Sequence, residues 1–196
     1  MTATPTPMPR RRRRAVAALE LALALPFLLI LLLGGTDIVR FVATANKIDR
    51  TAATLADLLA RADRLEDRPD CAASNCLGSL YLAADEVATP LDLQASGRVI
   101  LTAVVDPGSG PAEIAWQRTR GELPEADSRI GIPGAPATLP EGFSLPADDT
   151  AVIAEVYYEF APFPLSGDLL FSGLLTERIY RIAYFRPRFG DLSSLD

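Results

Sequence analysis

Side chains that could carry out catalysis are few in this chain of 196 residues, which contains no histidine. The lack of histidine excludes Ser-His-Asp and Cys-His triads and every metal site that needs an imidazole. Among the carboxylates, Asp148 and Asp149 are adjacent. Glu155 and Glu159 are expected on one solvated strand face, about 13 Å apart and too distant for an acid/base pair. We therefore expect no enzyme, no catalytic residue, no cofactor and no small-molecule substrate.

The two cysteines, Cys71 and Cys76, are the other candidates for chemistry. Two thiols cannot hold a structural zinc ion by themselves, and their spacing is not that of a C-x-x-C redox motif. A redox site and half of a metal site are the alternatives, and neither has a partner ligand in the sequence. Outside the cytoplasm an isolated pair by default forms a disulfide. We expect a structural disulfide worth about 2 kcal/mol, because it closes a small loop, and no metal site.

A membrane segment precedes these residues. Between Ala15 and Thr36 only Glu20 is charged, and a helix of this length spans about 33 Å, enough for a hydrocarbon core of about 30 Å. The run Arg10 to Arg14 holds the N-terminal side in the cytoplasm, so the rest of the chain is expected outside. The predicted divisions are a basic leader at 1–14, a transmembrane helix at 15–36 and an extracytoplasmic domain at 37–196. A cleaved secretory signal is the competing interpretation, for which the apolar run is long.

Composition limits the partners of the domain. Hydrophobic residues make up 49% of the chain, which excludes a disordered protein. After Thr36 the chain carries 14 basic and 24 acidic residues. An acidic body of this kind is poorly suited to binding nucleic acid or anionic lipid.

Both ends of the chain resemble a known family. The resemblance is carried by Arg13–Glu20 followed by the apolar run Leu21–Leu33, by Gly34–Arg40 at the exit of the span, and by Ile182–Arg188 near the C-terminus. These segments resemble the N-terminus of type IV prepilins and, more narrowly, the TadE/TadG-like pseudopilins of the tight-adherence (Flp) pilus system.

In that family a prepilin peptidase removes the basic leader, and a glutamate is the fifth residue of the mature chain. The resemblance implies a cut between Ala15 and Val16, with Glu20 at the fifth position. The family usually has glycine before the cut, where this chain has alanine. After cleavage, the free amino group of Val16 could pair with Glu20 of a neighbouring subunit and set the register between helices.

The resemblance implies a minor pseudopilin that helps to assemble an adhesive pilus. It would be a single-pass protein of the bacterial inner membrane, with its N-terminus in the cytoplasm and its domain in the periplasm. Its expected partners are the prepilin peptidase, other pilins and pseudopilins, and the assembly platform. One alternative is an uncleaved, membrane-anchored accessory or binding protein of a secretion or surface-assembly complex. Another is a secreted hydrolase that uses carboxylates.

The pattern beyond the span predicts an α+β fold, with one long helix packed on an antiparallel sheet of about four strands, as in pilins. Apolar residues recur every three or four positions to about Leu65, so the helix continues as an amphipathic one, with Asp37 among the residues on its wet side. A short helix is predicted at Gly78–Ala88. The strands are predicted at Arg98–Val105, Glu113–Arg118, Val152–Phe160 and Arg178–Phe185.

Three finer expectations concern how the sheet is covered. Ile114 and Trp116 are expected on one face of their strand, with Glu113, Ala115 and Gln117 on the other. Gly121–Asp149 is rich in glycine and proline and is predicted to be a long exposed loop. A second loop is predicted at Ala161–Ser172.

Overall fold

The computed structural model describes residues 10–71, 73–163 and 178–196. The loop predicted at 161–172 lies outside the described residues from position 164 onward. The chain divides into two compact units. One contains the N-terminal helix up to Arg40 with Pro162 and Phe163, and the other contains Phe41–Ala161 and the described residues from Arg178 onward.

The long N-terminal helix predicted from the sequence is confirmed. Helix α1 runs over Arg10–Ala60 and keeps Pro26 in its interior, and it ends about five residues before the predicted end. From Thr44 onward its buried residues recur at three- and four-residue steps, the period of a helix with one side against a core. They include Ala45, Ile48, Ala52, Leu55 and Leu59.

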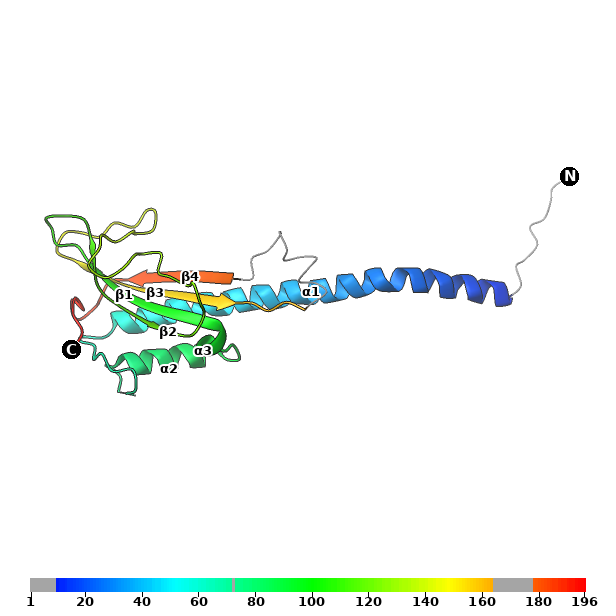
Figure 1. The fold of residues 1–196 in the computed structure, drawn as a ribbon, viewed down its shortest axis with the longest axis horizontal. Helices are drawn as coiled ribbons and strands as arrows, with labels where there is room; N and C mark the ends of the chain where they lie inside the picture. Colours follow the sequence, from blue (N-terminus) through cyan, green and yellow to red (C-terminus); the bar gives the residue numbers. More distant parts are fainter. Residues whose placement is uncertain (1–9, 72, 164–177) are drawn as a thin grey trace. The chain divides into compact units, whose positions relative to one another are not determined.

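Four strands form one antiparallel sheet in the order β2-β1-β3-β4 (Figure 1). The strands are β1 (Gly97–Val105), β2 (Glu113–Arg120), β3 (Thr150–Glu159) and β4 (Arg178–Phe185), and two short helices, α2 (Leu77–Ala88) and α3 (Leu93–Ser96), precede them. The α+β class and the four-stranded sheet predicted from the sequence are confirmed. β1 and β3 are central, so they are buried on both faces, whereas β2 and β4 form the edges.

Helices cover one face of the sheet, which we call the helix face. Alternate residues of each strand point to it, and three arginines there contact the helical side of the domain. Arg181 of β4 lies 3.8 Å from Asp49 of α1, and Arg120 of β2 lies 3.3 Å from Asp85 of α2. Arg118 of β2 pairs with Asp67, which follows α1. Phe41 of α1 also packs edge-on against Phe160, with ring centroids 5.5 Å apart.

The opposite face is covered by the long segment 121–149, and we call it the loop face. Leu123, Ala126, Ile130 and Leu145 of that segment are buried, in clusters that include Ile100 and Ile153 of the sheet. The prediction of a long exposed loop was therefore wrong. Glycine and proline correctly indicated irregular backbone, but the apolar residues between them supply one layer of the core.

A bulge in β2 overturns the predicted placement of Ile114 and Trp116. Trp116 lies opposite Ala103 and Ile114 lies opposite Val104, with a register shift between them. Because Ala103 and Val104 are neighbours in β1, they point to opposite faces. Ile114 thus joins the core of the loop face, whereas the indole of Trp116 lies on the helix face and donates to the carbonyl of Leu192 at 2.7 Å.

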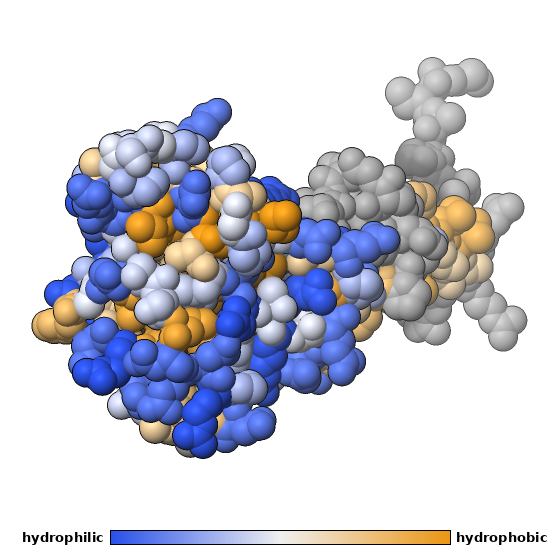
Figure 2. Space-filling model, turned by 60° about the vertical axis from the view of Figure 1, so that its left-hand side comes forward, coloured by the Kyte–Doolittle hydropathy of each residue, from blue (hydrophilic) through white to orange (hydrophobic). Residues whose placement is uncertain are grey.

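The C-terminal tail returns to the end of α1. The amide of Arg188 donates to the carbonyl of Ala60 at 2.8 Å, and Asp196 exchanges backbone hydrogen bonds with Leu65 and Asp67. Gly190 makes this return possible, because a Cβ at that position would lie 2.3 Å from the carbonyl oxygen of Asp63. On the face drawn in Figure 2, hydrophilic residues predominate, with smaller hydrophobic patches between them.

Candidate functional site

The residues predicted for peptidase processing lie on the first turns of α1. Ala15, Val16 and Glu20 are all helical and exposed. Val16 and Glu20 are four positions apart, which brings their side chains to the same side of the helix, about one turn from each other. This geometry leaves Glu20 open to a partner outside the chain.

The apolar side chains that follow are exposed as well. The most apolar window of this helix has a mean hydropathy of 2.7, and none of that window is buried. A helix that is apolar on all sides and lacks a covering protein surface suits the interior of a membrane or a bundle of helices. One such helix near the N-terminus fits a single-pass membrane protein. The large exposed side chains include Val16, Leu19, Leu21, Leu23, Leu25, Phe27, Leu28, Leu29, Leu31 and Leu32.

Asp37, at the end of the predicted span, is fully buried, so its predicted place on the wet side of the helix was wrong. Its carboxylate accepts a hydrogen bond from Arg40 at 2.6 Å and one from the backbone amide of Phe163 at 2.8 Å. The guanidinium of Arg40 also lies over the Phe163 ring, 4.7 Å from its centroid. A buried charge is tolerated when it is paired and hydrogen-bonded. Helical periodicity could not reveal this, because the covering residues come from far along the chain.

The structure joins Cys71 and Cys76 in a disulfide. Glu66 lies beside it: one carboxylate oxygen is 3.8 Å from the Cys76 sulfur, and the other accepts from the side-chain amide of Asn75 at 2.9 Å. Among the described residues, Glu66, Cys71 and Cys76 form the one group of three acidic or cysteine side chains whose potential metal-ligand atoms all lie within 4.8 Å of one another. The disulfide occupies both sulfurs, so the group offers a single carboxylate, too few ligands for a metal site.

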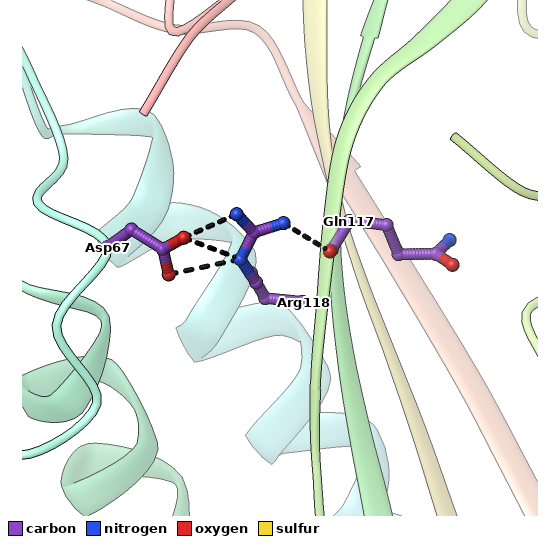
Figure 3. A network of polar contacts seen from close by, with 3 residues as sticks. All are labelled: Asp67, Gln117 and Arg118. Atoms are coloured by element: carbon purple, nitrogen blue, oxygen red, sulfur yellow. Dashed lines mark hydrogen bonds and ion pairs between the residues drawn. The ribbon is translucent and has the colours of Figure 1, made fainter. Parts of the chain in front are cut away.

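Next to this loop, Asp67 binds the guanidinium of Arg118 through both carboxylate oxygens (Figure 3). Arg118 in turn donates to the carbonyl of Gln117 at 2.9 Å. The hydrogen bond from Arg118 lowers the pKa of Asp67, and the carboxylate of Asp67 raises the pKa of Arg118. This bidentate pair ties β2 to the segment between α1 and the disulfide, which is a structural role.

Glu155, expected on a solvated strand face, is fully buried in the loop face, so that prediction was wrong for it. The backbone amide of Arg129 and the hydroxyl of Tyr180 each donate to one of its oxygens at 2.9 Å, and the Ser128 hydroxyl donates to the other. Glu159 on the same strand is exposed, as predicted. The two carboxylates are therefore in different environments and form no pair.

The tyrosines around Glu155 are unsuited to proton transfer near neutral pH. Burial raises the pKa of Tyr180, and the negative charge of Glu155 raises it further. Burial also raises the pKa of Tyr157, whose hydroxyl donates to the carbonyl of Asp127 at 2.7 Å. Asp149 accepts from the amide of Thr150 and lies 3.4 Å from Arg186, again in a structural arrangement.

Comparison with known proteins bears on the N-terminal helix. Residues 15–57 match the family model of TadE-like proteins. Comparison with curated proteins and with solved structures gives no match. The matched segment contains Val16 and Glu20, the exposed apolar run and the buried Asp37, and TadE-like proteins are not a family of enzymes. The resemblance predicted from the sequence is thus confirmed over residues 15–57, and the match is consistent with a TadE/TadG-like protein of the tight-adherence pilus system.

Proposed function

We propose that this chain is a minor pseudopilin-like membrane protein that takes part in assembly of a tight-adherence (Flp) pilus. A prepilin peptidase cuts between Ala15 and Val16, and the processed protein acts through packing of its N-terminal helix and contacts with other subunits. The leader at 1–14 is cytoplasmic, the helix crosses the inner membrane over 15–36, and the domain from 37 onward is periplasmic. The disulfide between Cys71 and Cys76 stabilises that domain.

One observation carries the proposal: the match to TadE-like proteins includes the apolar run up to Leu32, whose large side chains no described residue of this chain covers. A helix of this kind gains stability from lipid or from other helices, rather than from its own domain. Glu20 is the exception in the run. A carboxylate within a membrane helix is costly near the centre of the bilayer, so its presence favours a positively charged partner.

The contact surface extends beyond the predicted span. Ile38, Val39 and Val42 are 45%, 68% and 50% exposed on α1, and a Cβ added at Gly35 would meet no atom within 4 Å. The chain's own fold therefore does not need glycine at this position. A small residue here does permit close approach of a second helix, the arrangement that packs helices within membranes. Other pilins or pseudopilins are the proposed occupants of this side of α1.

The proposal is tested by the N-terminal sequence and intact mass of the full-length chain, expressed in membranes with and without its cognate prepilin peptidase. We expect a chain that starts at Val16 only when the peptidase is present. A Glu20→Ala variant should be processed but should enter pilus complexes much less than the parent chain, measured by crosslinking to other subunits. Asp49→Asn, on the same helix but within the domain, is the matched control and should enter them normally.

A second candidate is an uncleaved accessory protein anchored in the same membrane. It is favoured by Ala15, which stands where the family usually has glycine. An intact N-terminus in the presence of an active peptidase would support it, and an Ala15→Gly variant should then become a substrate. A chain that begins beyond Gly35 would overturn both candidates, because it would identify residues 15–36 as a cleaved signal.

A further inference from the structure

The disulfide loop contains a third potential ligand that the spacing of the cysteines does not reveal. Cys71, Cys76 and Glu66 bring two sulfurs and one carboxylate oxygen within 4.8 Å of one another. With the disulfide closed, both sulfurs are bonded and the group offers the carboxylate alone. The chain reaches this state through a dithiol, because a disulfide forms by oxidation of two free thiols. In that reduced chain the same loop offers two thiols and a carboxylate.

Backbone contacts hold Glu66 beside Cys76 independently of the sulfur–sulfur bond. The amide of Glu66 donates to the carbonyl of Asn75 at 2.8 Å, and its carbonyl accepts from the amide of the residue after Cys76 at 3.2 Å. Together they form a parallel β-bridge. Gly78 packs tightly against the other cysteine, since a Cβ there would lie 2.3 Å from the carbonyl oxygen of Cys71. None of these contacts involves a sulfur atom, so reduction leaves the three side chains together.

The spacing of the ligand atoms suits a small ion with tetrahedral coordination. In a zinc site, bonds of about 2.3 Å to sulfur and about 2.0 Å to a carboxylate oxygen place those two ligand atoms about 3.5 Å apart. One carboxylate oxygen of Glu66 already lies 3.8 Å from the Cys76 sulfur. The two sulfurs of such a site are about 3.8 Å apart. Rotation about the Cα–Cβ bonds of Cys71 and Cys76 gives this separation once the disulfide is open, because their Cα atoms lie 6.1 Å apart.

Neighbouring side chains orient the carboxylate and leave the oxygen that faces Cys76 accessible. The side-chain amide of Asn75 donates to the other oxygen of Glu66 at 2.9 Å, a contact of the kind that orients metal ligands. Arg68 lies 3.6 Å from the oxygen that faces Cys76, and its side chain is 70% exposed, so this ion pair is weak. Two thiolates and one carboxylate exceed the charge of a divalent ion by one, and Arg68 offsets that excess.

We propose that the reduced loop binds Zn²⁺ through Cys71, Cys76 and Glu66, with water as the fourth ligand. Cys76 is fully buried, whereas the side chain of Glu66 is 35% exposed and leaves one side open to solvent. Zinc accepts thiolate together with carboxylate, whereas Mg²⁺ and Ca²⁺ take oxygen ligands and Cu⁺ prefers sulfur.

Metal and disulfide exclude each other in this loop. Binding of Zn²⁺ releases the two thiol protons. A disulfide oxidant that closes the bond between Cys71 and Cys76 takes up the two electrons, is itself reduced to two thiolates, and frees the ion. Zinc thus holds the loop in shape before the disulfide does. The expectation of no metal site is amended for the reduced chain alone, and the inference goes beyond the proposed role in pilus assembly without depending on it.

The test compares the two redox states of the full-length chain in a mild neutral detergent. A phosphine reductant opens the disulfide and is removed in the absence of oxygen, and calorimetric titration with Zn²⁺ alone measures binding to each state. We expect one Zn²⁺ per reduced chain and no saturable binding to the oxidised chain. The chain contains no histidine, so no imidazole competes. Co²⁺ in place of Zn²⁺ should give the thiolate-to-cobalt absorption and the visible bands of a tetrahedral site.

Substitutions in the reduced chain identify the ligands. Glu66→Gln keeps both thiols and nearly the same shape, but it should bind Zn²⁺ at least about tenfold more weakly because a charged ligand is lost. Cys71→Ser should lose saturable binding. Glu86→Gln makes the same chemical change as Glu66→Gln at an exposed position outside the group and should bind like the parent. The fluorescence of Trp116 identifies any variant that has lost its fold, and the redox comparison needs no variant.

The outcomes decide the proposal. Binding of one Zn²⁺ to the reduced parent, weakened in Glu66→Gln and kept in Glu86→Gln, supports the site. Equal binding by the oxidised parent overturns it, since the ion would then lie elsewhere. Equal binding by Glu66→Gln overturns it as well, because two thiols would then bind the ion without the carboxylate. A reduced parent without saturable binding has the same consequence. Because no pilus component is present, failure here leaves the proposed role in pilus assembly intact.

Discussion

The buried carboxylate of Glu155 should anchor segment 121–149 to the sheet, and Glu155→Gln tests this directly. Glu155 is 0% exposed and accepts from Ser128, Arg129 and Tyr180. The Arg129 amide can only donate, whereas the two hydroxyls can donate or accept. The glutamine amide has nearly the same shape, and its one acceptor oxygen can still accept from Arg129 and Tyr180, but its NH2 group then faces Ser128 and makes that hydroxyl the acceptor.

The magnitude follows from those contacts. Three hydrogen bonds to a charged group, each worth about 1.5–3 kcal/mol, become bonds between neutral groups worth about 0.5–1.5 kcal/mol each. Relief from burying a charge offsets part of this loss. We therefore expect the free energy of unfolding to fall by about 2 kcal/mol. Glu159→Gln makes the same chemical change at an exposed position of the same strand, and it should stay within about 0.5 kcal/mol of the parent.

Urea unfolding of the full-length chain in detergent, followed by the fluorescence of Trp116, measures the global effect. Hydrogen exchange at the Arg129 amide measures the local one, because that amide donates to Glu155 at 2.9 Å. If the segment opens locally, about 2 kcal/mol corresponds to exchange about thirtyfold faster. Unchanged stability together with unchanged exchange at Arg129 would refute the reasoning, since the loop face would then be held by apolar contacts alone.

Three further predictions concern other contacts of the same fold. Asp37→Ala should speed hydrogen exchange at the Phe163 amide, which loses its carboxylate acceptor, by an amount that corresponds to about 1–3 kcal/mol; Asp49→Ala should not. Cys71→Ser should lower the free energy of unfolding by about 2 kcal/mol because it opens a small loop. A reductant should lower the free energy of unfolding of the parent chain by the same amount and leave that of the variant unchanged. Burial raises the pKa of Tyr180, so on titration with base the tyrosinate absorbance should rise at a higher pH in the folded protein than in the urea-unfolded protein. From neutral pH up to about pH 10, the ordinary tyrosine pKa, the urea midpoint should be constant, and it should fall above that pH as the unfolded state ionises first. A midpoint that rises there would contradict the assignment.

Local patterns were enough to predict most of the elements. The apolar run and the three- and four-residue period predicted one continuous helix, which is observed as Arg10–Ala60. Alternation and turn residues located all four strands to within a few positions, because each of these signals depends on neighbours in the chain. The resemblance at Arg13–Glu20 and the apolar run after it predicted the family match over 15–57.

The failures share a physical cause, which is that burial depends on segments distant in the chain. Glu155 looks like the polar side of a half-buried strand, but segment 121–149 covers that face. Asp37 looks like the wet side of a helix, but its acceptor role is fixed by Phe163, 126 residues later. Trp116 was placed with Ile114 because strict alternation cannot register a bulge. The one sequence signal for the burial of Glu155 and Asp37 is that each is an acidic residue among apolar ones. The same pattern also fits an exposed carboxylate unless the covering segment is known.

Helix α1 serves two environments, and its side chains divide accordingly. Up to Leu32 the large aliphatic residues are exposed on all sides, which water alone does not favour and which lipid or neighbouring helices do. From Thr44 onward the buried positions are often small, such as Ala45, Ala52 and Ala56, and small residues let a helix lie close to the sheet. Among the described residues, none covers the large apolar side chains of the first half, whereas the second half packs most of its apolar side chains into the core. A chain of this design needs an external environment for one half of its helix, and that requirement is the physical reason to look for its function in the membrane and among other subunits.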